Sequence, residues 1–287
     1  MTPENASDDG VRAGIRSAFA RLQEQYRALG GWRYSGSLPA EEGYGYLGPW
    51  AWSEGDYQYK FARLLEDEPG FRGHVHIEVP LRPAFRSGLD LSPGALGTSH
   101  VDIVVTDFTD TLPDATVDAG DLLRDHCHSA FIEAKWFLKS APRWRNINWR
   151  AFERGVRSDI QRLSKQQKNG WCQVAAMLVV DDWGWHAWRM WTEWADVDLP
   201  PNVEYLVLVP PCPACESFSI HPIVWGFPDH EIERRAQQGR FVLGGCLVNG
   251  DGSDPTWQCN SCGNEWNPPG IPGPRIPSPR RTLEPPP

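Results

Sequence analysis

Apolar residues recur at regular spacings along most of the chain. Spacings of three and four predict a helix over 11–29 and a second over 53–66, and alternation of apolar and polar residues predicts strands over 75–81 and 101–105. The remaining predicted elements are a strand over 130–137, a helix over 149–168, and strands over 174–181 and 205–210. This order of elements predicts an α/β domain with a mixed sheet flanked by helices.

The composition changes after Pro210 and Pro211 to residues rich in Cys, Gly and Pro. Nine of the last twenty residues are Pro, which is typical of an extended or disordered tail. The sequence therefore predicts four parts: an N-terminal helix with a Gly and aromatic-rich connection (1–49), the α/β domain (50–210), a small module (211–267) and a Pro-rich disordered tail (268–287).

The chain of 287 residues has a net charge of -9, which argues against nonspecific packaging of nucleic acid. Basic residues are concentrated between Lys135 and Lys168, where ten of them accompany two acidic ones. Helical spacing places several of these basic residues on one stripe of the predicted helix, including Arg150, Arg154, Arg157 and Lys165. This stripe is either a solvated face or a surface that contacts phosphates. No segment approaches the length of a membrane span and the start lacks signal-peptide features, so we expect a cytoplasmic protein without membrane partners.

Two charged residues interrupt the apolar strand predicted over 130–137. Strand alternation places Glu133 and Lys135 on one face, and Asp102 lies in a neighbouring predicted strand. Two carboxylates that meet across adjacent strands can bind Mg²⁺, and a lysine beside them can orient a metal-bound water or stabilise charge on a phosphate. The alternative is an ordinary surface ion pair worth ~0–1 kcal/mol. The apolar surroundings favour a site for phosphodiester hydrolysis.

These residues resemble the motif of the PD-(D/E)xK nuclease superfamily, which has the restriction-endonuclease-like fold. Over 50–180 the chain has Glu54 on a helix, then Asp102 in HVDIVV, then Glu133 and Lys135 in FIEAKW, then an amphipathic helix. The resemblance implies a three-layer α/β/α core with a mixed sheet. It also implies that Asp102 and Glu133 bind Mg²⁺ or Mn²⁺, that Lys135 assists the attacking water, and that Glu54 lies near the metal.

The implied activity is that of a metal-dependent endonuclease acting on DNA, in bacterial genome defence, a mobile element or repair. One departure from the motif is Val101 before Asp102, where the family often has proline. The alternatives are a non-catalytic adaptor that binds nucleic acid or protein, and a nuclease acting on RNA or single strands. The joint presence of Asp102, Glu133 and Lys135 favours the enzyme over the adaptor.

Four of the seven cysteines form two Cys-x-x-Cys pairs separated by 43 residues: Cys212 with Cys215, and Cys259 with Cys262. Four thiolates complete a tetrahedral Zn²⁺ site, which makes the ion structural, and zinc supplies folding free energy to so small a module. The segment over 212–266 resembles zinc ribbons found fused to bacterial proteins, through which protein partners could bind.

Two other features of the sequence have competing interpretations. Cys246, in GGCLV, could replace a ligand in either cysteine pair, but its setting predicts a buried small residue at a strand entry. Five of the fifteen Trp residues lie within 183–194. They could stack on nucleobases, but their helical spacing favours packing in a core.

Overall fold

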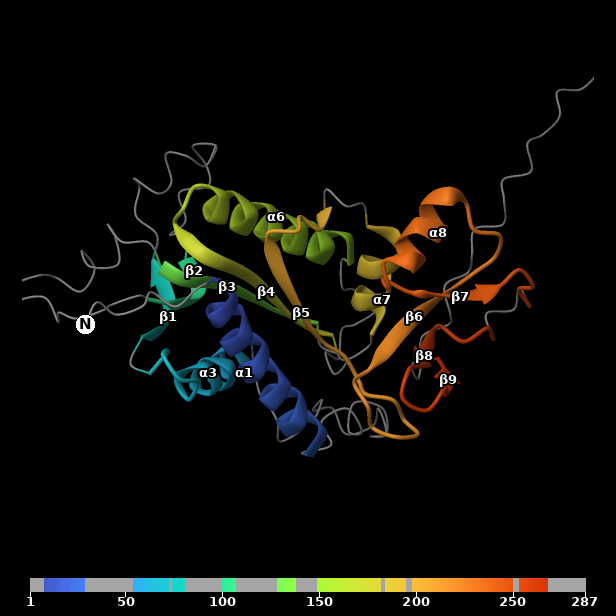
Figure 1. Ribbon diagram of the computed structural model, residues 1–287, viewed down its shortest axis with the longest axis horizontal. Coiled ribbons are helices and arrows are strands. Elements are labelled where there is room, and N and C mark those ends of the chain that lie inside the picture. Colours follow the sequence, from blue (N-terminus) through green and yellow to red (C-terminus); the bar gives the residue numbers. More distant parts are fainter. Residues whose placement is uncertain are drawn as a thin grey trace, which may run out of the picture. The chain divides into compact units, whose positions relative to one another are not determined.

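The chain divides into two compact units, of which the first is Met1–Asp182 with Ala195–Leu208 and the second is Trp183–Trp194 with Val209–Pro287. The computed structural model describes residues 8–28, 54–72, 74–80, 100–106, 128–137, 149–181, 184–194, 198–249 and 253–267 (Figure 1). The connection over 29–49 and the tail over 268–287 lie outside the described residues. The predicted boundary at 210 and 211 assigned Trp183–Trp194 to the α/β domain, whereas contacts group this segment with the second unit.

The first unit contains a mixed five-stranded sheet, as the sequence predicts. Its elements are α1 (Asp8–Ala28), α3 (Glu54–Glu66), β1 (Val75–Pro80), β2 (His100–Val105), β3 (His128–Phe137), α6 (Trp149–Lys168), β4 (Cys172–Asp181) and β5 (Val203–Leu208). The strand order is β1-β2-β3-β4-β5. Strands β1, β2 and β3 pair antiparallel, and β3, β4 and β5 pair parallel.

Helices α3 and α6 cover opposite faces of this sheet (Figure 1). Successive strand residues point to opposite faces. Trp136 of β3 contacts Tyr57 of α3, with ring centroids 6.5 Å apart. The preceding residue, Lys135, has its Nζ 3.4 Å from Asp159 Oδ2 of α6. The first unit is therefore an α/β domain with helices on both faces of the sheet.

Apolar helix faces and the central strand form the core of the first unit. The predicted apolar positions of the second helix are buried, including Tyr57 and Phe61, which are fully inaccessible. On α6 the buried apolar stripe consists of Val156, Ile160 and Leu163. Strand β4 is buried almost continuously, because a parallel strand with helices on both faces has no solvent-facing side.

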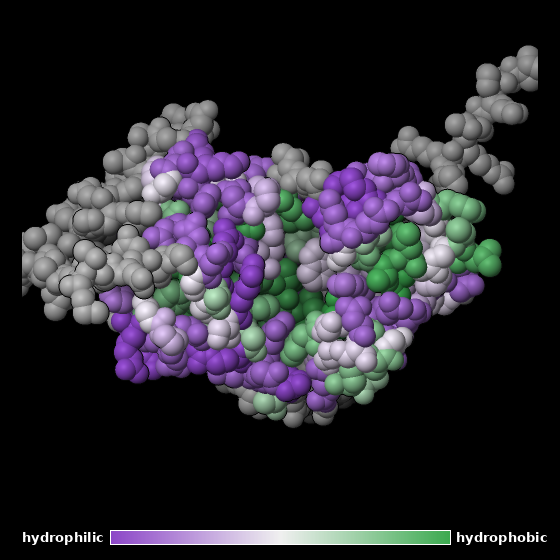
Figure 2. Space-filling model, viewed as in Figure 1, coloured by the Kyte–Doolittle hydropathy of each residue, from purple (hydrophilic) through white to green (hydrophobic). Residues whose placement is uncertain are grey.

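The sheet of the second unit has the strand order β7-β6-β8-β9. Its elements are α7 (Trp185–Glu193), β6 (Ile220–Trp225), α8 (His230–Gln237), β7 (Val242–Gly245), β8 (Trp257–Cys259) and β9 (Glu265–Trp266). The surface of α8 is hydrophilic, and the helix has no buried residue (Figure 2). Among the described residues, no helix has the length and apolar character needed to cross a membrane.

Tryptophans of α7 pack into the second unit. Trp188 Nε1 donates a hydrogen bond to the carbonyl oxygen of Ile223 at 3.2 Å, and the Trp191 ring meets the Trp257 ring edge-on at 6.0 Å. Gly184, before α7, has φ 69°, and a Cβ there would lie 3.2 Å from Trp257 Nε1. The predicted packing role therefore holds for these tryptophans, although in the second unit.

An ion-pair cluster fixes β5 to α1 in the first unit. Glu204 accepts from Arg12 Nη1 at 2.8 Å and from Arg16 Nε at 2.6 Å. Burial tends to raise the pKa of Glu204, but the hydrogen bonds from the two arginines outweigh burial and lower that pKa. The charged form of Glu204 therefore stabilises the fold.

Glu204→Gln should lower the free energy of unfolding at pH 7 by about 1 kcal/mol. Because the native pKa lies below the unfolded value of about 4.3, the contribution of Glu204 is complete above that pH and is lost as the pH falls through the native pKa. Urea unfolding from pH 7 to pH 3 should therefore show the gap between wild type and variant closing in acid. A gap independent of pH would contradict this assignment.

Candidate functional site

Strands β2 and β3 bring the two predicted metal-binding carboxylates to facing positions. Their antiparallel register pairs Ile103 with Ile132, and continuing it by one position places Asp102 opposite Glu133. Asp102 Oδ2 accepts a hydrogen bond from the Ala134 N–H at 2.7 Å, which directs this carboxylate toward β3. Since side chains directly opposite each other share a face of the sheet, Asp102 lies on the face that carries Glu133.

Glu133 is a buried carboxylate, with 2% of its surface exposed. Burial raises the pKa of Glu133 well above its usual value; Arg162 opposes this shift, and the charges of Asp102 and Asp159 add to it. Glu133 Oε1 lies 2.8 Å from Arg162 Nη2, which satisfies the distance of an ion pair, although this oxygen has no partner in hydrogen-bonding geometry. Arg162 therefore supplies the positive charge that a carboxylate in the core requires.

Lys135 is less buried and contacts the same helix. Its Nζ lies 3.4 Å from Asp159 Oδ2, and Asp159 Oδ1 accepts from Arg162 Nη2 at 2.9 Å. Positive and negative groups thus alternate from Lys135 through Asp159 and Arg162 to Glu133. We call these four residues together with Asp102 the Glu133 cluster.

Two members of the Glu133 cluster, Asp159 and Arg162, are absent from the site predicted by the sequence. Their spacing of three places them one turn apart on α6, and Asp159 directly precedes the buried Ile160. An acidic and a basic residue beside an apolar stripe would have been the signal. In the sequence, both residues stand out only as part of the charge of the basic segment 135–168.

The side chain of Glu54, the fourth predicted site residue, lies outside the described residues. Glu54 is the first residue of α3. The same helix contacts Trp136 through Tyr57, on the face of β3 opposite Lys135. The described contacts join Asp102, Glu133 and Lys135 in one cluster.

The predicted basic stripe of α6 divides into exposed and paired residues. Arg154 and Lys165 are exposed. Arg157 is half-buried, and its Nη1 lies 3.7 Å from Asp198 Oδ2. The Arg150 side chain lies outside the described residues. Arg154 and Lys165 thus remain accessible to a phosphate backbone.

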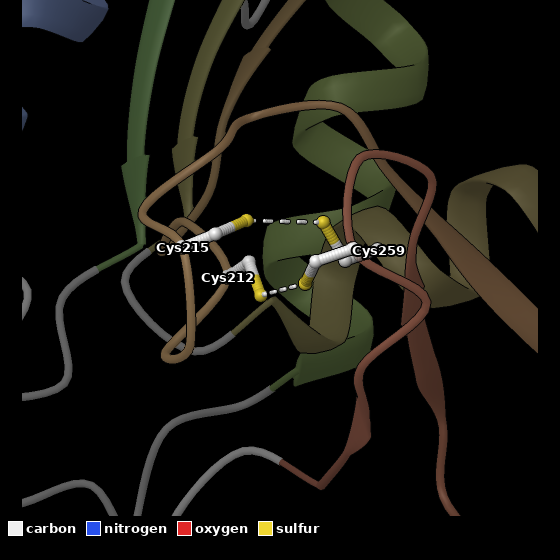
Figure 3. Close-up of side chains that lie close together, drawn as sticks. Cys212, Cys215 and Cys259 are labelled. Carbon is white, nitrogen blue, oxygen red and sulfur yellow. Dashed lines mark hydrogen bonds between the residues drawn. The ribbon is translucent and has the colours of Figure 1, made fainter.

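The four predicted zinc ligands converge in the second unit (Figure 3). Their sulfur atoms all lie within 4.8 Å of one another, and the shorter separations are 3.7 Å from Cys212 to Cys262 and 3.6 Å from Cys215 to Cys259. Four sulfur ligands at such separations can hold one metal ion such as zinc, and they leave no tetrahedral position open.

The two cysteine loops have the same backbone hydrogen bonds. In the first, the Cys212 carbonyl accepts from the Glu216 N–H at 2.8 Å and the Cys212 N–H donates to the Ser217 carbonyl at 2.9 Å. In the second loop, the Cys259 carbonyl accepts from the Gly263 N–H and the Cys259 N–H donates to the Asn264 carbonyl, each at 2.8 Å. The fourth position after the first cysteine has positive φ in both loops, 57° at Glu216 and 74° at Gly263. One loop geometry therefore presents both pairs of thiols.

The electrostatics of the four thiols favour a bound cation. Burial tends to raise the pKa of Cys259, but N–H groups of Cys262 and Ser261 outweigh it, and the pKa falls to about 7. The N–H of Ser217 lowers the pKa of Cys215, yet the neighbouring thiols, that of Cys262 foremost, raise it to about 12. The thiols thus resist losing all their protons together, and a metal ion that neutralises the thiolates removes this obstacle.

Cys246 does not join the four-cysteine group, as the sequence analysis expects. The accompanying prediction that it is buried at a strand entry is wrong, because Cys246 is exposed and follows the end of β7. The strand ends one residue earlier in Gly245, whose φ of 102° turns the chain away from the sheet.

Comparisons of the chain with protein-family models, with curated proteins and with solved structures give no match.

Cys212→Ser and Cys259→Ser should each abolish stoichiometric zinc binding, because each removes one of four converging sulfurs. Cys246→Ser, the matched control, should retain one zinc per chain. Metal analysis of the purified variants tests both expectations, and circular dichroism should show that the first unit stays folded. Zinc loss in Cys246→Ser with full retention in Cys259→Ser would identify a different ligand set.

Proposed function

We propose that the protein is a Mg²⁺-dependent or Mn²⁺-dependent nuclease that hydrolyses phosphodiester bonds of DNA. The observation that carries this proposal is the facing pair of Asp102 and Glu133 on adjacent strands, with Lys135 on the same face. In the same proposal, the four cysteines of the second unit bind a structural Zn²⁺ ion in a zinc ribbon.

The donor set fits a hard divalent cation. Mg²⁺ prefers oxygen ligands and usually binds through one or two carboxylates, taking its other ligands from water and substrate phosphate. Asp102 and Glu133 provide two carboxylates. A bound metal ion would polarise the phosphate and lower the pKa of a coordinated water. Lys135 would orient that water or stabilise negative charge on the phosphate.

The order and pairing of elements give further support. A helix, three antiparallel strands, a crossover helix and a parallel strand correspond to α3, β1 to β3, α6 and β4. This order agrees with the restriction-endonuclease-like core that the motif resemblance implies, which we propose as the fold of the first unit. DNA as the substrate rests on that resemblance.

A non-catalytic adaptor is the second candidate, and one specific observation favours it. Glu133 is almost fully buried and pairs with Arg162, as a purely structural carboxylate would. In this alternative the first unit is a scaffold, and the second unit, with its four cysteines, binds the nucleic acid or protein partner. DNA binding without cleavage in the presence of Mg²⁺ or Mn²⁺ would favour the adaptor.

Asp102→Asn should lower the rate of DNA cleavage by at least ~100-fold. Substitutions that only reorient a metal ligand lower activity by ~10–100-fold, and removing a ligand's charge should cost at least as much as the largest of these. The asparagine oxygen can still accept from the Ala134 N–H, so the strand pair should remain intact while the negative charge is removed. Cleavage of supercoiled, linear and single-stranded DNA should be measured with Mg²⁺, with Mn²⁺ and with EDTA.

Lys135→Ala should cause a comparable loss of cleavage in the same assay. Glu204→Gln is the matched control, because it also removes a carboxylate from the first unit but should leave cleavage unchanged. Glu204 pairs with arginines of α1, away from the Glu133 cluster. Full activity in Asp102→Asn, or activity that persists in EDTA, would disprove the proposed metal site.

Arg154→Ala combined with Lys165→Ala should weaken DNA binding and flatten its salt dependence. Each lost phosphate contact removes ~0.9 from the log–log slope, so the pair should remove roughly 1.8. Binding should be measured in the Asp102→Asn background to prevent cleavage. Arg63→Ala, an exposed arginine on α3, is the control. An unchanged slope would show that the exposed face of α6 is merely solvated.

A further inference from the structure

Arg162 is the most buried of the basic residues described on α6, ahead of the half-buried Arg157. Arg154, Lys165 and Lys168 are exposed, whereas the Arg162 side chain is only 19% exposed. Its Nη2 atom lies 2.8 Å from Glu133 Oε1 and 2.9 Å from Asp159 Oδ1. One nitrogen of Arg162 is thus shared by a carboxylate of the sheet and a carboxylate of its own helix.

The position of this nitrogen conflicts with a divalent ion at Glu133. A metal ion and a guanidinium both require the negative charge of that carboxylate, and two cations held against it repel each other. The Glu133 cluster has three carboxylates and two basic groups, so its formal charge is -1 before a metal ion binds. Releasing Arg162 from Glu133 frees the charge of that carboxylate for the metal ion.

We propose that Arg162 is a resident cation that holds Glu133 in position in the metal-free protein and competes with the divalent ion for this carboxylate. The inference rests on the proposed nuclease function and adds a regulation of the same site. Arg162 acts through Glu133 and is therefore a positioning residue. The metal ion binds fully only when Arg162 leaves Glu133, and the released guanidinium is then available to a substrate phosphate.

Asp159 makes this exchange feasible. It accepts from Arg162 across one turn of α6, so Arg162 keeps a carboxylate partner after it leaves Glu133. The other oxygen of Asp159 lies 3.4 Å from Lys135 Nζ, which links the lysine to the same exchange. The apparent metal affinity is then reduced by the fraction of molecules in which Arg162 occupies Glu133.

Direct binding of Mn²⁺ to the zinc-loaded full chain tests the inference without relying on activity. Arg162→Gln should bind Mn²⁺ about tenfold more tightly than wild type. Electron paramagnetic resonance or calorimetry measures this affinity. A tenfold gain means that Arg162 occupies Glu133 in about nine of ten metal-free wild-type molecules. Adding Glu133→Gln to this variant should remove the gain. Arg157→Gln is the matched control, because Arg157 is another partly buried arginine of α6 with a carboxylate partner.

Stability supplies a second readout, because Arg162→Gln leaves Glu133 buried without its cation. In the zinc-loaded protein without added Mn²⁺, the variant should have a lower Tm than wild type, and it should gain more Tm from Mn²⁺ than wild type does. Unchanged or weaker Mn²⁺ affinity in a folded Arg162→Gln overturns the inference. A zinc-loaded variant that is unfolded without Mn²⁺ and is not restored by Mn²⁺ overturns it as well.

The failure of this inference can be distinguished from the failure of the proposed function. If wild type cleaves DNA with Mg²⁺ but Arg162→Gln shows no gain in Mn²⁺ affinity, the nuclease proposal stands and the role of Arg162 is wrong. If wild type cleaves no DNA but Arg162→Gln binds Mn²⁺ more tightly, Arg162 does compete with a metal ion and the nuclease proposal fails.

Discussion

Burial of the Glu133 carboxylate is the constraint on which the arrangement of the first unit depends. A carboxylate that is 2% exposed needs a positive partner to keep its charge, and Arg162 of α6 provides it. This requirement fixes the rotation of α6 about its axis, because Arg162 must face the sheet together with the apolar stripe of Val156, Ile160 and Leu163. The exposed basic residues of α6 follow from the same rotation. One ion pair thus relates the interior of the domain to its charged surface.

Strand periodicity made much of this site predictable. Alternation in FIEAKWF places Glu133 and Lys135 on one face, and the β2–β3 register then places Asp102 opposite Glu133. Helix periodicity predicted less of the site. A residue that borders an apolar stripe faces the core or the solvent depending on how the helix is rotated about its axis. Asp159 and Arg162 lie at this border, and only the packed position of α6 shows that both face the sheet.

The four-cysteine group of the second unit likewise shows what local patterns predict and what long-range contacts decide. Each Cys-x-x-Cys pair is a local pattern, so all four converging thiols were predictable from spacing. The exposure of Cys246 was not, because the apolar residues after it suggested a strand, whereas β7 ends at Gly245. The grouping of Trp183–Trp194 depends on long-range contacts, such as that of Trp191 with Trp257, which the sequence pattern does not specify.

The connection between β4 and β5 explains why Trp183–Trp194 groups with the second unit rather than with the predicted α/β domain. Parallel strands require a crossover connection, and the helix in such a connection usually packs on its own sheet. Here the connection contains α7, whose Trp188 bonds to Ile223 of the second unit. The chain therefore leaves the first unit and returns before it completes the sheet with β5. Because β5 carries Glu204, which pairs with α1, residues from both ends of the first unit meet only after the chain has made this excursion.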